Sequence, residues 1–232
     1  MFDFTGEEID AIQLSLWVAS IGMLASLPFG LLAAYALARW RFPGKLLLDG
    51  LVHLPLVMPP VVTGYLLLVL MGRRGPIGSF LDQHFGIVFS FRWTGAALAC
   101  AVMGFPLMVR AIRLSFEAAD RRLEDAARTL GANGLIVFAT VTLPLALPGI
   151  LAGMVLSFAK ALGEFGATIT FVSNIPGETR TLPAAIYTFT QVPGGDEGAM
   201  RLVVVAILLS LAALIVSELL ARRVALRIGG TA

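Results

Sequence analysis

Lys160 and Glu164 carry opposite charges in the mostly apolar segment SFAKALGEFGAT, where they stand four residues apart. On a helix this spacing places two side chains on the same face, within reach of an ion pair. Ionisable groups near the interior of a membrane are costly and are often functional. Three interpretations remain open: an interfacial ion pair, two groups facing a water-filled cavity between subunits, and part of a proton relay.

The chain lacks the motifs of the common catalytic and metal sites. It has no G-x-x-x-x-G-K-[ST] phosphate loop, because its one Gly-Lys pair, at Gly44 and Lys45, is followed by leucine. H-E-x-x-H and G-x-S-x-G are also absent. His53 and His84 are far apart, and Cys100 is the single cysteine. We therefore predict no catalytic residue, no metal site and no cofactor on this chain, so that any ATP hydrolysis must come from another chain.

The composition is that of an integral membrane protein. Of the 232 residues, 58% are hydrophobic and 14% are charged, and the mean hydropathy is +0.88. Soluble domains are about 45–50% apolar and about 25% charged. This composition predicts that the protein lies in a lipid bilayer. No feature of the sequence indicates a nucleic-acid partner.

Five stretches are long and apolar enough to cross a membrane as helices, which takes about 20 residues each. They cover residues 12–38, 51–72, 94–114, 135–159 and 202–221. The sequence thus predicts an all-α integral membrane protein with about five transmembrane helices in a single domain, 1–232. An odd number of spans places the two termini on opposite sides.

The distribution of basic residues predicts the orientation. One set of connections and the C-terminal segment contain Arg39, Arg41, Lys45, Arg110, Arg113, Arg121, Arg122, Arg128, Arg222, Arg223 and Arg227. The other set contains fewer: Arg73, Arg74, Arg92, Lys160, Arg180 and Arg201. Because the more basic side is usually cytoplasmic, we predict the N-terminus outside and the C-terminus inside. The acidic start, MFDFTGEEID, is not typical of a cleaved signal peptide.

The second stretch contains the proline-rich run LPLVMPPVVTG. A proline inside a helix removes a backbone hydrogen bond and bends the helix. In lipid the freed carbonyl groups need protein or water partners, and bent helices often line the cavities of transporters. This run therefore predicts a functional bend.

The connection 120–134, on the predicted cytoplasmic side, predicts a short helix and the loop after it. Asp120 can cap the start, Gly131 can end it, and Glu124 and Arg128 can form an i,i+4 ion pair. About 11 residues give about 16 Å, too short to cross a membrane. One face is apolar and shallow: Leu123, Ala126, Ala127 and Leu130. This face favours docking to another protein over a helix lying on the membrane surface.

This connection resembles the E-A-A-x-x-x-G…I-x-L-P motif of the permease subunits of ABC importers. Asp125 stands at the glutamate position, Gly131 at the glycine, and Val141, after nine intervening residues, at the isoleucine. Glu124 is a second candidate for the acidic group. In that family the segment is the coupling helix, which contacts the ATPase subunit. The resemblance implies this role for Glu124, Asp125, Ala126, Ala127, Gly131, Leu143 and Pro144.

Longer segments resemble the molybdate branch of this family. They are residues 42–45, 53–62, 126–131, 163–168 and 173–181. Sulfate permeases share the overall pattern, including a similar Gly-Glu-aromatic-Gly segment, and remain the alternative. An autonomous secondary transporter is a further alternative, but we find neither internal repeats nor clusters of ionisable residues in the spans.

The resemblance implies a type I ABC importer in the bacterial cytoplasmic membrane. It implies a second copy of this chain, two copies of an ATPase subunit that holds ATP and magnesium, and an extracytoplasmic oxyanion-binding protein. The pathway would be lined by Pro59, Pro60, Gly64, Gly163, Glu164, Phe165 and Gly166. Glu178 and Arg180 would be docking charges for the binding protein, and residues 182–191 would form a short helix.

Overall fold

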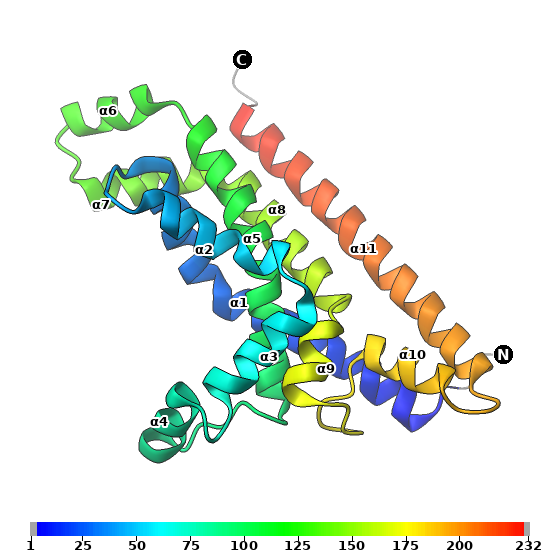
Figure 1. The fold of residues 1–232 in the computed structure, drawn as a ribbon. Helices are drawn as coiled ribbons and strands as arrows, with labels where there is room; N and C mark the ends of the chain where they lie inside the picture. Colours follow the sequence, from blue (N-terminus) through cyan, green and yellow to red (C-terminus); the bar gives the residue numbers. More distant parts are fainter. Residues whose placement is uncertain (1–3, 230–232) are drawn as a thin grey trace.

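The computed structural model describes residues 4–229, and every regular element in that range is helical. The elements in chain order are α1 (Gly6–Arg39), α2 (Lys45–Val57), α3 (Pro60–Met71), α4 (Pro76–Phe85), α5 (Trp93–Ala118), α6 (Arg121–Thr129), α7 (Gly134–Val137), the π-helix η1 (Phe138–Thr142), α8 (Leu143–Leu162), α9 (Gly166–Val172), α10 (Leu182–Thr190) and α11 (Asp196–Gly229). The predicted all-α fold is confirmed for these residues (Figure 1).

Among the described residues, four helical runs are long and apolar enough to cross a membrane: α1, α5, Gly134–Leu162, and Asp196–Val216 within α11. Helices α2 and α3 pass the same test only as a pair, which is bent by 115°. The total is therefore four, or five with the bent pair, in agreement with the five predicted stretches. Helix α1 starts close to α10, whereas α11 runs to the opposite end of the bundle (Figure 1).

The bend between α2 and α3 lies at Met58 and Pro59, within the proline-rich run. Met58 has an extended backbone, and Pro60 is the first residue of α3. Proline suits this position because its φ is already helical and its missing N–H is not needed there. The predicted bend is confirmed. Helix α2 begins earlier than the predicted residue 51 because Gly44, at φ +88°, turns the chain directly into it.

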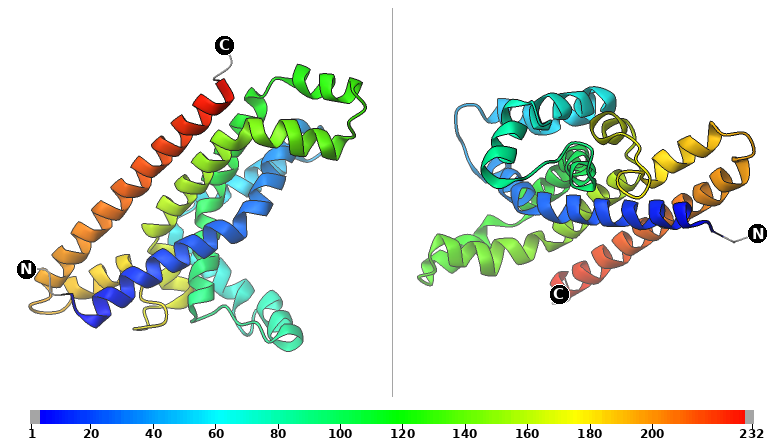
Figure 2. Two further views of the ribbon diagram at one scale, coloured as in Figure 1. Left: turned by 180° about the vertical axis from the view of Figure 1, so that it is seen from behind. Right: turned by 90° about the horizontal axis from the view of Figure 1, so that it is seen from below.

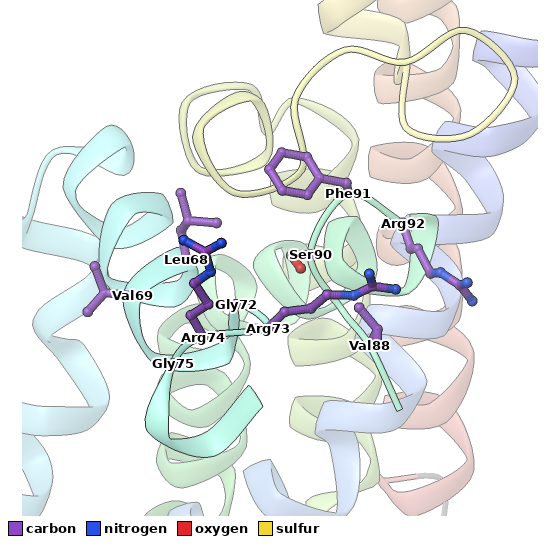
Figure 3. A pocket seen from close by; sticks show the side chains of 10 residues that line it. All are labelled: Leu68, Val69, Gly72, Arg73, Arg74, Gly75, Val88, Ser90, Phe91 and Arg92. Carbon is purple, nitrogen blue, oxygen red and sulfur yellow. The ribbon is translucent and has the colours of Figure 1, made fainter. Parts of the chain in front are cut away.

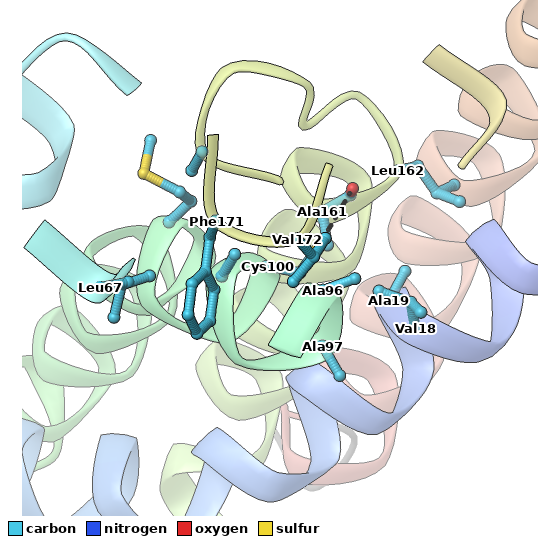
Figure 4. Close-up of a cluster of buried hydrophobic side chains, with 13 residues drawn as sticks. Val18, Ala19, Leu67, Ala96, Ala97, Cys100, Ala161, Leu162, Phe171 and Val172 are labelled. Carbon is cyan, nitrogen blue, oxygen red and sulfur yellow. Dashed lines mark hydrogen bonds between the residues drawn. The ribbon is translucent and has the colours of Figure 1, made fainter. Parts of the chain in front are cut away.

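Helix α5 lies at the centre of the bundle, with α1 and α8 packed against it (Figure 2). Small residues let these helices approach closely, as is common in membrane bundles. A Cβ atom added at Gly22 of α1 would lie 2.6 Å from the Ala97 carbonyl oxygen of α5. Around this contact a buried apolar cluster joins α1, α5, α8 and α9, with Cys100 and Phe171 inside it (Figure 4).

The two ends of the bundle differ. Helices α6 and α7 project at one end, here termed the α6 end, and α4 and α10 lie toward the other, the α10 end (Figure 2). A second buried cluster, which includes Leu37, Met108 and Phe116, joins α1, α2, α5 and α8 toward the α6 end. The predicted short helix at 182–191 is confirmed as α10.

Candidate functional site

Helix α6 begins and ends where the sequence predicts. The Asp120 side chain accepts a hydrogen bond from the Arg122 backbone N–H at 2.9 Å, which satisfies a donor that the helix itself leaves free. Gly131 follows the helix at φ +88°, a left-handed conformation that glycine adopts without strain. The helix is nine residues long.

The outward surface of α6 is uncovered by the described part of the chain. Glu124 is its one buried residue. Leu123 is 50% exposed, and Leu130, just after the helix, is 89% exposed. Ala126 is also exposed, whereas Ala127 is half-buried. A shallow apolar face is therefore open to another protein.

Glu124 and Arg128 do not form the predicted ion pair. Glu124 turns inward, where its Oε1 accepts hydrogen bonds from Arg39 Nη2 at 2.8 Å and from Thr142 Oγ1 at 3.1 Å. Arg128 instead pairs with Asp125 at 3.2 Å, on the exposed side. The buried guanidinium of Arg39 attracts the carboxylate more strongly than an exposed arginine can, because solvent screens it less. Asp125 is thus the exposed acid of the motif, and the Glu124 carboxylate is occupied within the chain.

Leu143 and Pro144 are the first two residues of α8. Leu143 packs against the buried cluster around Phe116. Proline cannot donate the backbone hydrogen bond of an interior helical position, and Pro144 stands just after the π-helix η1, inside the continuous helical run Gly134–Leu162. These two motif positions therefore lie within that run, apart from the open face of α6.

The Lys160–Glu164 ion pair is confirmed, at 2.7 Å, and it sits at the break between α8 and α9. The other carboxylate oxygen of Glu164 accepts a hydrogen bond from the Ala167 backbone N–H at 3.0 Å. The Glu164 side chain is 1% exposed and that of Lys160 is 29% exposed. One buried carboxylate thus holds the last turn of α8 and the first turn of α9 together.

Replacing Glu164 by glutamine should lower the free energy of unfolding by about 1–2 kcal/mol, less than for a fully buried pair because Lys160 can still reach water. Thermal unfolding of the purified protein in detergent measures this. Glu117→Gln is the matched control, because Glu117 also forms an i,i+4 ion pair, with Arg113, but the Glu117 side chain is 41% exposed. Equal melting temperatures for the two variants would contradict the structural role of Glu164.

Several predicted pathway residues meet where α3 crosses α9. A Cβ atom added at Gly64 would lie 2.5 Å from the Ala167 carbonyl oxygen, and one added at Gly166 would lie 2.8 Å from Pro60 Cβ. The two glycines therefore allow a contact that no larger residue would permit, next to Glu164. The structure thus brings the second predicted span together with the segment that follows the fourth.

The remaining predicted pathway residues lie around this crossing. Pro59 is exposed at the bend between α2 and α3. Gly163 follows the last residue of α8 and has space around it. A Cβ atom added there would have the Lys160 carbonyl oxygen as its one neighbour, at 4.0 Å. Phe165 packs against Tyr187 of α10, with ring centroids 5.3 Å apart. None of these three contributes to the close contact itself.

Glu178 and Arg180, the predicted docking charges, make contacts within the chain. Glu178 accepts a hydrogen bond from the Trp93 backbone N–H at 3.3 Å. Arg180 donates to Glu7 and to Asn174, each at 3.0 Å, and its side chain is 16% exposed. These contacts hold the loop before α10 against α1 and α5, so the two side chains already have partners.

The structure contains an arginine-lined cavity of about 720 Å³ that the sequence did not predict (Figure 3). It lies between the end of α3 and the loop before α5, and Arg73, Arg74 and Arg92 line it. Among the side chains that the structure describes, no carboxylate lies within ion-pair distance of these three arginines. The Arg-Arg pair is visible in the sequence, but its position beside Arg92 depends on the fold. The cavity offers positive charge to an anion.

The chain is similar to membrane components of known transport systems. Residues 26–228 match the family model described as binding-protein-dependent transport system inner membrane component. The molybdenum transport system permease protein ModB of Escherichia coli is 63% identical, over 94% of this chain and 95% of its own length. The ModB protein of Haemophilus influenzae is 60% identical, over 96% and 97%. The sulfate transport system permease protein CysW of Synechococcus elongatus is 42% identical, over 75% of this chain and 60% of its own length.

A solved structure shares the fold. A chain of a bacterial alginate ABC transporter, crystallised with its alginate-bound periplasmic protein, superposes with a TM-score of 0.74 over 95% of this chain and 80% of that chain. The sequence identity is 16%, so this likeness concerns the fold alone.

Proposed function

The chain belongs to the family of binding-protein-dependent transport system inner membrane components, and from this premise we propose that it is the permease subunit of an ATP-driven molybdate importer. The observation that supports molybdate as the transported anion is the 63% identity to a molybdenum permease across nearly the whole of both chains. The sulfate permease is more distant, at 42% over three quarters of this chain. Tungstate, a similar tetrahedral oxyanion, is a second cargo to test.

The proposed importer contains two copies of this chain, two copies of an ATPase subunit that binds ATP and magnesium, and an extracytoplasmic binding protein that delivers the oxyanion. The α6 end faces the cytoplasm and the α10 end faces outward, so the N-terminus is outside. The sequence contains no phosphate loop. The open face of α6, around Ala126 and Asp125, supports this arrangement because it offers another protein a surface that the chain itself leaves uncovered.

ATP binding would draw the ATPase subunits together and move α6, and the spans would then reorient between inward-open and outward-open states. In this scheme a coupling free energy links ATP binding on the ATPase to the conformation of the distant membrane spans. Pro60, Gly64 and Gly166, at the crossing of α3 and α9, belong to the proposed pathway. On the proposed outer side, Arg73, Arg74 and Arg92 supply positive charge that would concentrate an oxyanion near the entrance.

The test is reconstitution into liposomes with the ATPase and the binding protein, followed by uptake of molybdate, tungstate and sulfate. We expect molybdate uptake that requires ATP, the ATPase and the binding protein. A sample without the ATPase serves as the control. Uptake in that sample would contradict an ATP-driven importer, and sulfate taken up in preference to molybdate would contradict the proposed cargo.

A further inference from the structure

Helix α6 is fastened to the rest of the chain by one charged side chain. Glu124 is its one buried residue, while the apolar Leu123 and Ala126 are exposed. A helix that packs on a bundle normally buries an apolar stripe. Helix α6 leaves that stripe open and turns a carboxylate inward instead. Its attachment to the bundle is therefore polar and local.

The Glu124 carboxylate meets two other elements. Its Oε1 lies 2.8 Å from Arg39 Nη2, at the last residue of α1, and 3.1 Å from Thr142 Oγ1, at the last residue of η1. The side chains of Arg39 and Glu124 are each 8% exposed. The same Arg39 nitrogen lies 3.5 Å from the Ala119 carbonyl oxygen, at the end of α5. One ion pair thus joins α6 to the ends of α1 and α5 and to the turn that enters α8.

These ends are themselves packed together. Tyr35 of α1 contacts two aromatic rings, with its centroid 5.4 Å from that of Phe116 of α5 and 5.1 Å from that of Phe138 of η1. Both contacts are edge-on, the arrangement that aromatic pairs favour. Because the three ends form one packed unit, a displacement of Glu124 acts on α1, α5 and α8 together.

The ion pair has room on one side. A cavity of about 400 Å³ adjoins it, lined in part by Arg39, Arg121 and Asp125. The Nε of Arg39 is buried without a hydrogen-bond partner in the described structure. Arg39 is therefore held through one nitrogen of its guanidinium, Nη2, while its Nε stays without a hydrogen bond. Such a contact can transmit force and can still shift between two arrangements.

We propose that Arg39, Glu124 and Thr142 form the tie that passes the movement of α6 into the membrane-spanning helices. The proposal rests on the proposed function, in which α6 contacts the ATPase. The three side chains act as positioning residues, since they contact neither ATP nor the transported anion. A buried ion pair suits this task because removal of one partner leaves the other charged and desolvated, which holds the two together.

The test uses the complete complex in liposomes, with Glu124→Gln, the charge exchange R39E/E124R, Thr142→Val and the control Glu117→Gln. Glutamine keeps the size of Glu124 and removes its charge. We expect Glu124→Gln to retain the ATPase and to hydrolyse ATP at nearly the normal rate, while molybdate taken up per ATP falls about tenfold, within the usual range of coupling between sites. The charge exchange should restore part of this ratio, Thr142→Val should lower it less, and Glu117→Gln should leave it unchanged.

A second readout does not depend on transport. Spin labels are placed at Thr129 on α6 and at Gln83 on α4, both exposed, in separate samples, and each reports the distance to its counterpart in the second copy. Cys100 is buried, so it does not compete for the label. In the unmodified complex ATP should change both distances. In Glu124→Gln the Thr129 distance should still change and the Gln83 distance should not.

The outcomes separate this tie from the proposed function. Normal uptake per ATP and a normal Gln83 response in Glu124→Gln would overturn the tie and leave the importer intact. Loss of the ATPase from that variant would also overturn it, since Glu124 would then be a docking residue. If Glu124→Gln does not fold, an unchanged ratio in Thr142→Val, which keeps the ion pair, overturns the tie. Absence of molybdate uptake in the unmodified complex would contradict the proposed function, and the label distances would still test the tie.

Discussion

Arginine in place of Ala126 is expected to detach the ATPase partner and to abolish ATP-driven uptake. Ala126 is exposed and lies almost opposite the buried Glu124 on α6, because successive residues of a helix are about 100° apart. A face made of alanine lets a partner approach closely, and a long charged side chain there prevents that approach. We expect the affinity for the ATPase to fall by at least about 100-fold, or about 3 kcal/mol.

Copurification of the ATPase with the permease, and ATP-driven molybdate uptake in liposomes, measure this effect. Gln191→Arg is the control, because it adds the same charge at an exposed position at the α10 end. The same change at the half-buried Ala127 should have a smaller effect on docking. A complex of Ala126→Arg that retains its ATPase would show that this face of α6 is not the docking surface.

The features that could be predicted from the sequence depend on neighbouring residues. Asp120 and Gly131 determine the ends of α6 through contacts within a few residues. Lys160 and Glu164 pair across one helical turn. The bend before Pro60 follows from the fixed φ and the missing N–H of proline. Local rules suffice where no distant residue competes.

The features that were missed depend on distant residues. Glu124 prefers Arg39, which is 85 residues away, to Arg128 on its own helix. No spacing rule could rank these partners, since the choice depends on which arginine the fold buries. Arg180 likewise binds Glu7, 173 residues away. The arginine cavity has the same origin, because Arg92 joins Arg73 and Arg74 only in the folded chain.

Alanine in place of Gly64 is expected to force α3 and α9 apart and to stop transport. The added Cβ would lie 2.5 Å from the Ala167 carbonyl oxygen and 2.9 Å from its Cα, well inside the ordinary contact range of 3.4–4 Å. The obstructing atoms belong to the backbone, so a change of rotamer cannot relieve the clash. The helices must separate by on the order of 1 Å, and such overpacking typically costs about 1–3 kcal/mol.

The control Gly50→Ala separates this clash from the general effect of losing a glycine. Gly50 lies within α2 with no atom within 4 Å of an added Cβ. Alanine there should raise the free energy of unfolding by up to about 1 kcal/mol, because alanine favours a helix more than glycine does. Opposite shifts of the melting temperature for two identical substitutions would then reflect the space around each glycine. If Gly64→Ala melts and transports like the unmodified protein, α3 and α9 do not cross as closely as this structure has them. In that case Gly64 and Gly166 lose their place in the proposed pathway.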